Sequence, residues 1–185
     1  FYMLNLTINR FSVAAFNNMY YATAAKSRKS KLYLNDFFYP LDRIANWHRI
    51  YGRKGFIEYQ AVVPFDGAYG TIFELLKKIT KSKLGSNIAA LKPLTKSDGL
   101  ISFPIDGFTL AVDFAYSENL WPLLDQLDRI VIASGGRVYL AKDARLSGKS
   151  FKEMYSNSLE KWELVREKYQ VKESFTSLMF NRLLK

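Results

Sequence analysis

The chain has 185 residues, of which 49% are hydrophobic and 16% aromatic, so it can form the packed core of one domain with an appendage. It has no cysteine and one histidine, which excludes disulfides, zinc–thiolate centres and multi-histidine metal sites, and no metal site is expected. The net charge of +10 favours an anionic partner such as nucleic acid, anionic lipid or a phosphorylated ligand.

The first predicted segment, residues 1–36, is a helical and basic arm. Alanines spread through residues 12–27 favour a helix there. A basic cluster follows, and a second one lies further along the chain; each is either a solvated face or a phosphate-binding surface. The first cluster is Lys26, Arg28, Lys29 and Lys31, and the second is Lys77, Lys78, Lys81 and Lys83. The first residue is Phe, and we expect the chain to be the later part of a longer protein.

The next segment, residues 37–143, carries the clearest hydrophobic periodicity. After a short helical turn around Trp47, the pattern predicts strands over 56–64, 86–94, 101–116 and 136–143, and helices over 67–83 and 117–136. The order βαββαβ is that of a ferredoxin-like fold. The predicted class is therefore α+β, an antiparallel sheet with helices on one face.

An antiparallel sheet covered on one side leaves its other face open, and the strand period of two assigns side chains to each face. Residues such as Tyr59 and Val112 belong to the apolar sets that face the helices. The open face then carries Glu58, Gln60, Thr109, Ala111 and Asp113.

Residues 144–185 predict a C-terminal helical tail. Its apolar stripes exceed what one small sheet can cover, so we expect the tail to need another partner. The stripes are Met154, Leu159, Trp162 and Val165, then Phe175, Leu178, Met179 and Leu183.

One function compatible with a basic βαββαβ domain is the binding of single-stranded RNA, as in an RRM. Lys54-Gly55-Phe56 begins like the RRM signature RNP1, but Ile57 and Glu58 do not continue it. The segment also lies on the first strand rather than the third. The open face has a carboxylate and an amide where stacking aromatic residues belong.

Three blocks carry a more specific pattern: PLDRIANWHRIYGRKGFIEYQAVVP (40–64), SFPIDGFTLAVDF (102–114), and residues 136–162, which begin GRVYLAKDAR. In order and spacing they resemble FAD-linked oxidoreductases of the vanillyl-alcohol-oxidase superfamily. Within it they resemble most the family of decaprenylphosphoryl-ribose oxidases. Sugar-lactone oxidases of the same superfamily match these blocks less well.

The resemblance implies different roles for the two later segments of the chain. Residues 37–143 would form a cap that covers the flavin and binds substrate, and residues 144–185 would pack on an N-terminal FAD domain that precedes this chain. FAD would be held mainly by that domain. The longer protein would oxidise a sugar hydroxyl, with a polyprenyl-phosphate-linked pentose as substrate, and would serve cell-wall sugar metabolism. The isolated chain would be inactive and would self-associate through its tail.

The same resemblance implies roles for individual residues. Lys142 would be catalytic, and Tyr139 and Lys142 would lie beside the flavin and substrate. Thr109 and Ala111 stand where mycobacterial members have an asparagine and a cysteine. The residues implied in substrate binding are Glu58, Gln60, Lys92, Thr109, Ala111 and Arg49.

Partners and location follow from the same resemblance. It implies a short-chain reductase as a partner, contact of the basic clusters with phosphate or a membrane surface, and no nucleic acid. A location in the cytoplasm or at the periphery of a membrane is expected. His48, the single histidine, is expected to be a surface or packing residue rather than a catalytic base.

Overall fold

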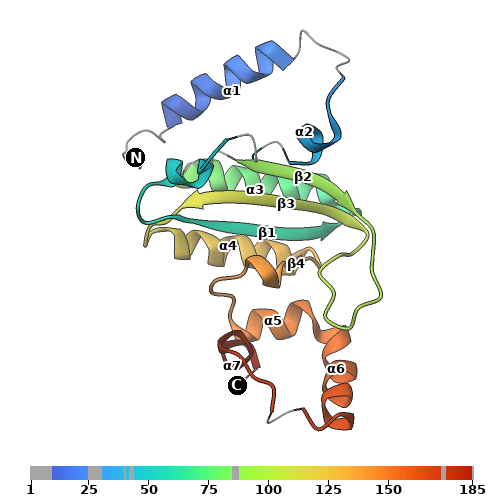
Figure 1. The fold of residues 1–185 in the computed structure, drawn as a ribbon. Coiled ribbons are helices and arrows are strands. Elements are labelled where there is room, and N and C mark those ends of the chain that lie inside the picture. The colour runs from blue at the N-terminus through green and yellow to red at the C-terminus, as the bar shows by residue number, and fades with distance from the viewer. Residues whose placement is uncertain are drawn as a thin grey trace.

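The computed structural model describes residues 10–24, 31–39, 41, 44–84, 88–171 and 174–184. Its centre is an antiparallel sheet with the strand order β2-β3-β1-β4 (Figure 1). Helix α3 follows β1, and helix α4 follows β3, which is the ferredoxin-like order and confirms the predicted fold class. The elements are β1 (Phe56–Pro64), α3 (Ala68–Ser82), β2 (Ala89–Leu94), β3 (Gly107–Ala115), α4 (Leu120–Ala133) and β4 (Arg137–Val138).

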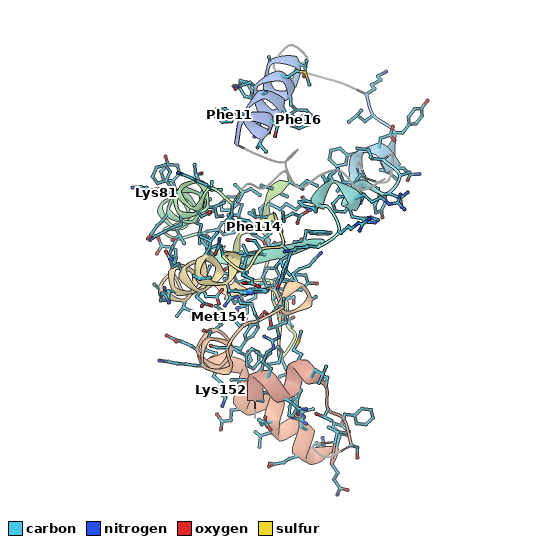
Figure 2. All side chains as sticks on the ribbon, turned by 90° about the vertical axis from the view of Figure 1, so that its left-hand side faces the viewer. Phe11, Phe16, Lys81, Phe114, Lys152 and Met154 are labelled. Atoms are coloured by element: carbon cyan, nitrogen blue, oxygen red, sulfur yellow. The ribbon has the colours of Figure 1, made fainter. Side chains whose placement is uncertain are left out.

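Helices α3 and α4 cover one face of the sheet (Figure 2). The apolar side chains of β1 and β3 meet them there, and Phe114 is completely buried. On α3 the spacing places Ile72 and Leu75 in the core and Ile79 against it. Leu76, which was predicted in the same stripe, lies at its margin and remains 41% exposed.

The predicted long strand 101–116 is wrong at its start, because β3 begins only at Gly107. This glycine passes so close to β1 that a Cβ atom on it would lie 2.0 Å from the carbonyl oxygen of Val63. Residues 101–105 run outside the sheet, where Pro104 has no N–H to donate. They form part of the loop that joins β2 to β3.

The predicted strand 136–143 is also shorter than expected. Strand β4 pairs with β1 only at Arg137 and Val138, and one further bond runs from the Tyr139 N–H to the Gln60 carbonyl. The chain then turns through the 3₁₀ helix η3 (Leu140–Lys142), which the sequence pattern did not predict. This turn brings Lys142 back toward the sheet.

Beyond the β2 edge of the sheet, the N-terminal segment forms α1 (Arg10–Ala24) and the short helix α2 (Leu34–Phe38) (Figure 1). Helix α1 lies where the alanine-rich stretch predicted a helix, and its large side chains, such as Phe11 and Phe16, are exposed. Three residues of the first basic cluster, Lys26, Arg28 and Lys29, lie outside the described residues.

At the opposite end of the sheet, the tail forms α5 (Gly148–Met154), α6 (Ser156–Lys168) and α7 (Leu178–Leu184) (Figure 1). The predicted helical tail is not one continuous helix, because it breaks at Tyr155 between α5 and α6. That side chain is buried, and its hydroxyl donates to the Val138 carbonyl at 2.9 Å. Helix α5 thereby joins the core of the domain.

The break divides the predicted apolar stripes of the tail. Met154 and Leu183 are buried in the domain core, while Trp162 is half-buried and packs against Phe180 within the tail. Phe175 and Leu178 are exposed, at 72% and 90%. In the part of the chain that is described, the tail therefore folds partly on its own domain and leaves part of its apolar surface uncovered.

Candidate functional site

The face of the sheet opposite α3 and α4 gathers most of the predicted site residues, and we call it the polar face. In the β1–β3 register, Glu58 lies across from Asp113 and Gln60 across from Ala111. Neighbouring positions point the other way, since the Tyr59 hydroxyl donates to Asp128 of α4 at 3.1 Å. The faces predicted from strand alternation are therefore the observed ones.

An ion pair closes one end of the polar face. The Lys142 ammonium, at the end of η3, lies 2.5 Å from the Glu58 carboxylate on β1. Their side chains are 39% and 24% exposed, so both can still meet a ligand. Exposed ion pairs stabilise folds little, and the main effect of this pair is to hold a cation above the polar face.

A hydrogen-bonded pair occupies the middle of the polar face. Gln60 Nε2 donates to Thr109 Oγ1 at 3.1 Å, and the Thr109 hydroxyl donates to the Ala61 carbonyl at 3.0 Å. Thr109 is buried, so its hydroxyl orients the Gln60 amide. Ala111, beside Gln60, is half-buried and adds no polar group.

Tyr139 forms an aromatic wall next to these groups. Its ring stacks on Phe103 with centroids 4.4 Å apart and planes 27° apart. Its backbone N–H is bonded to Gln60, which ties the start of η3 to the middle of β1. Tyr139 is therefore joined to the polar face by its backbone N–H. Lys142 is joined to it by the ion pair of its side chain with Glu58.

The other two predicted residues lie at the periphery. Lys92 on the edge strand β2 is exposed and lies across from Thr109 in the β2–β3 register. Arg49 is half-buried on the 3₁₀ helix η2 (Trp47–Tyr51), which precedes β1. Within η2, Trp47 and Tyr51 pack on Phe56, so the aromatic residues of this helix cover the polar face at the start of β1. His48 is exposed and makes an edge contact with the Trp47 ring.

Asp113 is the residue that sequence reasoning placed on this face but did not select for the site. The Tyr51 hydroxyl lies 3.5 Å from its carboxylate, at the long end for a hydrogen bond, and η2 keeps it buried. Burial raises the pKa of Asp113 to about 6, the charge of Glu58 adds to the rise, and Lys142 and the Tyr51 hydroxyl oppose it. Burial and the Asp113 charge in turn raise the pKa of Tyr51 above its ordinary value. A carboxylate with such a pKa is typical of functional sites.

The residues at this face suit the ring of a flavin. The Phe103–Tyr139 stack offers an apolar wall to a planar ring, and Lys142 provides a cation next to it. In the part of the chain that is described, no group of three metal-binding side chains occurs.

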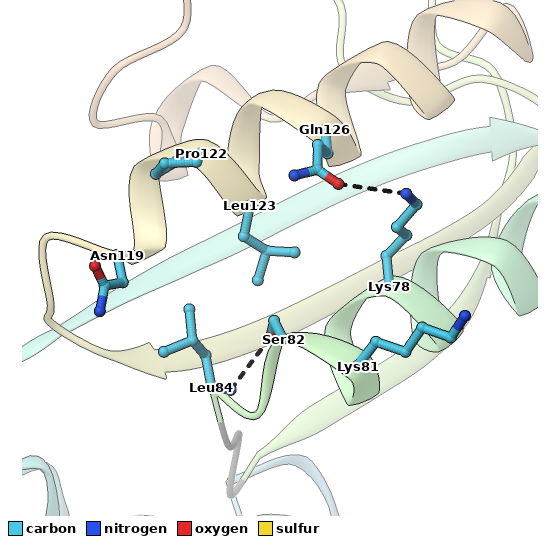
Figure 3. Close-up of a pocket in the computed structure, with 8 residues that line it drawn as sticks. All are labelled: Lys78, Lys81, Ser82, Leu84, Asn119, Pro122, Leu123 and Gln126. Atoms are coloured by element: carbon cyan, nitrogen blue, oxygen red, sulfur yellow. Dashed lines mark hydrogen bonds between the residues drawn. The ribbon is translucent and has the colours of Figure 1, made fainter.

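A pocket on the helix-covered side lies away from the polar face. It has a volume of about 380 Å³ and lies between the C-terminal end of α3 and the N-terminal end of α4 (Figure 3). Lys78 and Lys81 of the second basic cluster line it, and the Lys78 ammonium donates to Gln126 at 3.3 Å. Lys78 therefore connects the two helices, while Lys77, Lys81 and Lys83 are exposed.

The fold and the polar face define an α+β domain of ferredoxin-like topology with one ligand-accessible sheet face. No family model matches the chain. Over 176 residues, or 95% of the chain, it is 32% identical to a decaprenylphosphoryl-beta-D-ribose oxidase from Mycolicibacterium smegmatis and spans 38% of that protein. Over 138 residues, or 74% of the chain, it is 30% identical to an uncharacterized protein in the mprA 5′ region of Streptomyces coelicolor and spans 37% of it. The chain therefore spans less than two-fifths of these relatives.

The RNA-binding alternative is not favoured. The central strands present a carboxylate pair and an amide on the polar face, where an RRM requires exposed stacking rings. The aromatic residues at the start of β1, Tyr51 and Phe56, are stacked on one another. Among the described helices, none combines the length and the apolar character needed to cross a membrane.

Proposed function

We propose that this chain is the substrate-binding and flavin-covering part of an FAD-dependent oxidoreductase that oxidises a sugar hydroxyl. The observation that carries the proposal is the Lys142–Glu58 pair beside the Gln60–Thr109 pair on one accessible sheet face. The similarity of 95% of the chain to part of an oxidase supports the same class. A polyprenyl-phosphate-linked pentose is the substrate that we propose.

The polar face supplies what alcohol oxidation requires of a protein. Glu58 and Gln60 can hydrogen-bond sugar hydroxyls and so orient the reacting carbon. Lys142, held by Glu58, can stabilise negative charge that develops on the substrate oxygen. When bound, FAD supplies the acceptor for the hydride. Thr109 orients Gln60 rather than contacting the sugar, because its hydroxyl already bonds within the sheet.

The remaining parts of the machinery are also proposals. FAD would be held mainly by a domain outside these 185 residues, and the exposed apolar surface of the tail would pack on that domain. A short-chain reductase would act on the product. The exposed lysines of α3 would contact phosphate or an anionic membrane surface.

The test compares the chain with the longer polypeptide that contains it. We expect the 185-residue chain to retain little FAD and the longer protein to hold about one equivalent. Under anaerobic conditions, a polyprenyl-phosphate-linked pentose should bleach the flavin absorbance of the longer protein. Bleaching by an aldonolactone or its parent sugar instead would indicate a sugar-lactone oxidase. A longer protein that binds no flavin would refute the proposal.

A further inference from the structure

Apart from the pocket between α3 and α4, the domain has a cavity with a polar lining between the β2–β3 loop, strand β4 and the start of α6. It has a volume of about 330 Å³. Three cations from three different segments line it: Lys96 from the loop, Arg137 from β4 and Lys161 from α6. One acidic side chain, Asp98, lies at the same cavity, so cationic side chains outnumber acidic ones by three to one.

The cavity also contains groups that donate hydrogen bonds to oxyanions. Ser97 and Ser102 line it from the loop, with hydroxyl oxygens 2.5 Å apart, and Ser158 lines it from the first turn of α6. The N–H of Ser158 is bonded to the Tyr155 carbonyl at 2.9 Å, so the hydroxyl of this residue is the group that it offers to a ligand.

Arg137 is fixed in place at this cavity. Its Nη1 donates to the Ser102 carbonyl at 2.8 Å, and its guanidinium lies 5.1 Å from the centre of the Tyr155 ring. Its Nε is buried and finds no hydrogen-bond acceptor in the part of the chain that is described. A buried donor without an acceptor is costly, and an anion in the cavity would relieve that cost electrostatically.

We propose that this cavity binds a phosphate-class oxyanion, either free phosphate or the phosphoryl group of a larger ligand such as a phospholipid. Lys96, Arg137 and Lys161 provide the charge, and the serine hydroxyls provide directed donors. The site is separate from the Lys142 end of the polar face. In the β1 register, Arg137 lies across from Val62, four residues from Glu58, which is roughly 13 Å along a strand.

The first test is titration of the full 185-residue chain with inorganic phosphate. Binding is monitored through the NMR chemical shifts of the Gly99 and Ser158 amides. We expect saturable shifts. The double variant Lys96→Gln/Lys161→Gln should bind roughly tenfold more weakly or worse, the scale of losing charge-assisted hydrogen bonds. The matched control Lys149→Gln/Lys152→Gln removes the same charge from the exposed side of α5 and should bind within about twofold of the parent chain.

Two further arms separate the sources of the oxyanion. If the parent chain binds phosphatidylglycerol vesicles more tightly than phosphatidylcholine vesicles, and the Lys96→Gln/Lys161→Gln variant loses this preference, the ligand is a lipid phosphoryl group. If the double variant weakens binding of inorganic phosphate but leaves vesicle binding unchanged, the ligand is free phosphate. Linear, non-saturating shifts, or equal losses in the control variant, would overturn the site. Equal loss in Lys142→Gln would overturn its separation from the Lys142 end of the polar face.

Discussion

Glu58 and Asp113 lie directly across from each other on β1 and β3, on the face of the sheet that the helices leave open. Two carboxylates in this position repel, and Asp113 is the buried member. Their surroundings differ, because Lys142 forms an ion pair with Glu58, while the Tyr51 hydroxyl lies 3.5 Å from the Asp113 carboxylate. Burial therefore favours the protonated form of Asp113, whose pKa is raised to about 6.

Replacement of Asp113 by Asn should raise stability at neutral pH. Folding raises the pKa of Asp113 from 3.8 to about 6, so between those values the native state holds a proton that the unfolded chain has released. The stability that this proton contributes is fully present below about pH 4 and is lost as pH rises through 6. The free energy of unfolding should be measured with urea from pH 4 to 8. The difference between Asp113→Asn and the parent chain should grow in favour of the variant over this interval. The exposed control Asp98→Asn should give a curve parallel to that of the parent chain, and parallel curves for Asp113→Asn would refute the prediction.

Replacement of Lys142 by Ala should impair chemistry without unfolding the protein. In the longer, flavin-containing protein we expect turnover to fall by roughly 10²-fold or more, the scale of losing one preorganised charge. The isolated chain offers a second readout: because Lys142 opposes the rise of the Asp113 pKa, its loss should move the stability transition near pH 6 upward. The control is Lys149→Ala on α5. Unchanged turnover would remove Lys142 from the catalytic site.

Replacement of Arg145 by Ala should destabilise the fold by roughly 3–5 kcal/mol at pH 7. Arg145 donates to the buried Asp128 carboxylate at 2.7 Å, and its loss leaves that charge uncompensated in the core. The cost should shrink in acid, because burial already raises the pKa of Asp128 and the carboxyl then takes up a proton. Chemical denaturation at pH 4 and 7 measures both effects. Arg129→Ala, at an exposed position on α4, should be nearly neutral.

The 185-residue chain should self-associate at micromolar concentration through its tail. Phe175 and Leu178 expose apolar surface, and a two-fold contact between copies would cover it. Sedimentation should show a dimer or larger species that dissociates in Phe175→Ser/Leu178→Ser. The control Tyr69→Ser/Phe73→Ser removes a comparable exposed aromatic pair from α3 and should remain associated. A monomeric parent chain would contradict the prediction.

The βαββαβ core could be predicted because local periodicities and the tertiary fold agree. In β1 the alternation of Glu58, Tyr59 and Gln60 places each side chain on its observed face. The helix spacing of Ile72, Leu75 and Ile79 likewise marks the buried side of α3.

The errors lie where distant contacts decide the structure. Strand β3 begins at Gly107, where the backbone closely approaches Val63, and the tail breaks at Tyr155, whose hydroxyl bonds Val138. Neither contact leaves a local pattern. The burial of Asp113 depends on Tyr51, 62 residues away, so its perturbed pKa was invisible in the sequence. The Lys142–Glu58 pair spans 84 residues, and only a family resemblance brought Lys142 to attention.

The bond from Tyr59 to Asp128 has a consequence for how this surface can diversify. Tyr59 lies between Glu58 and Gln60 and is anchored through Asp128 to Arg145 on the opposite side of the sheet. An insertion or deletion of one residue within β1 would exchange the two faces of the strand. The carboxylate of Glu58 and the amide of Gln60 would then enter the hydrophobic core, and the Tyr59 ring would face solvent. New ligand preferences can therefore arise by substitution on the polar face. Changes in chain length are confined to the connections outside this strand.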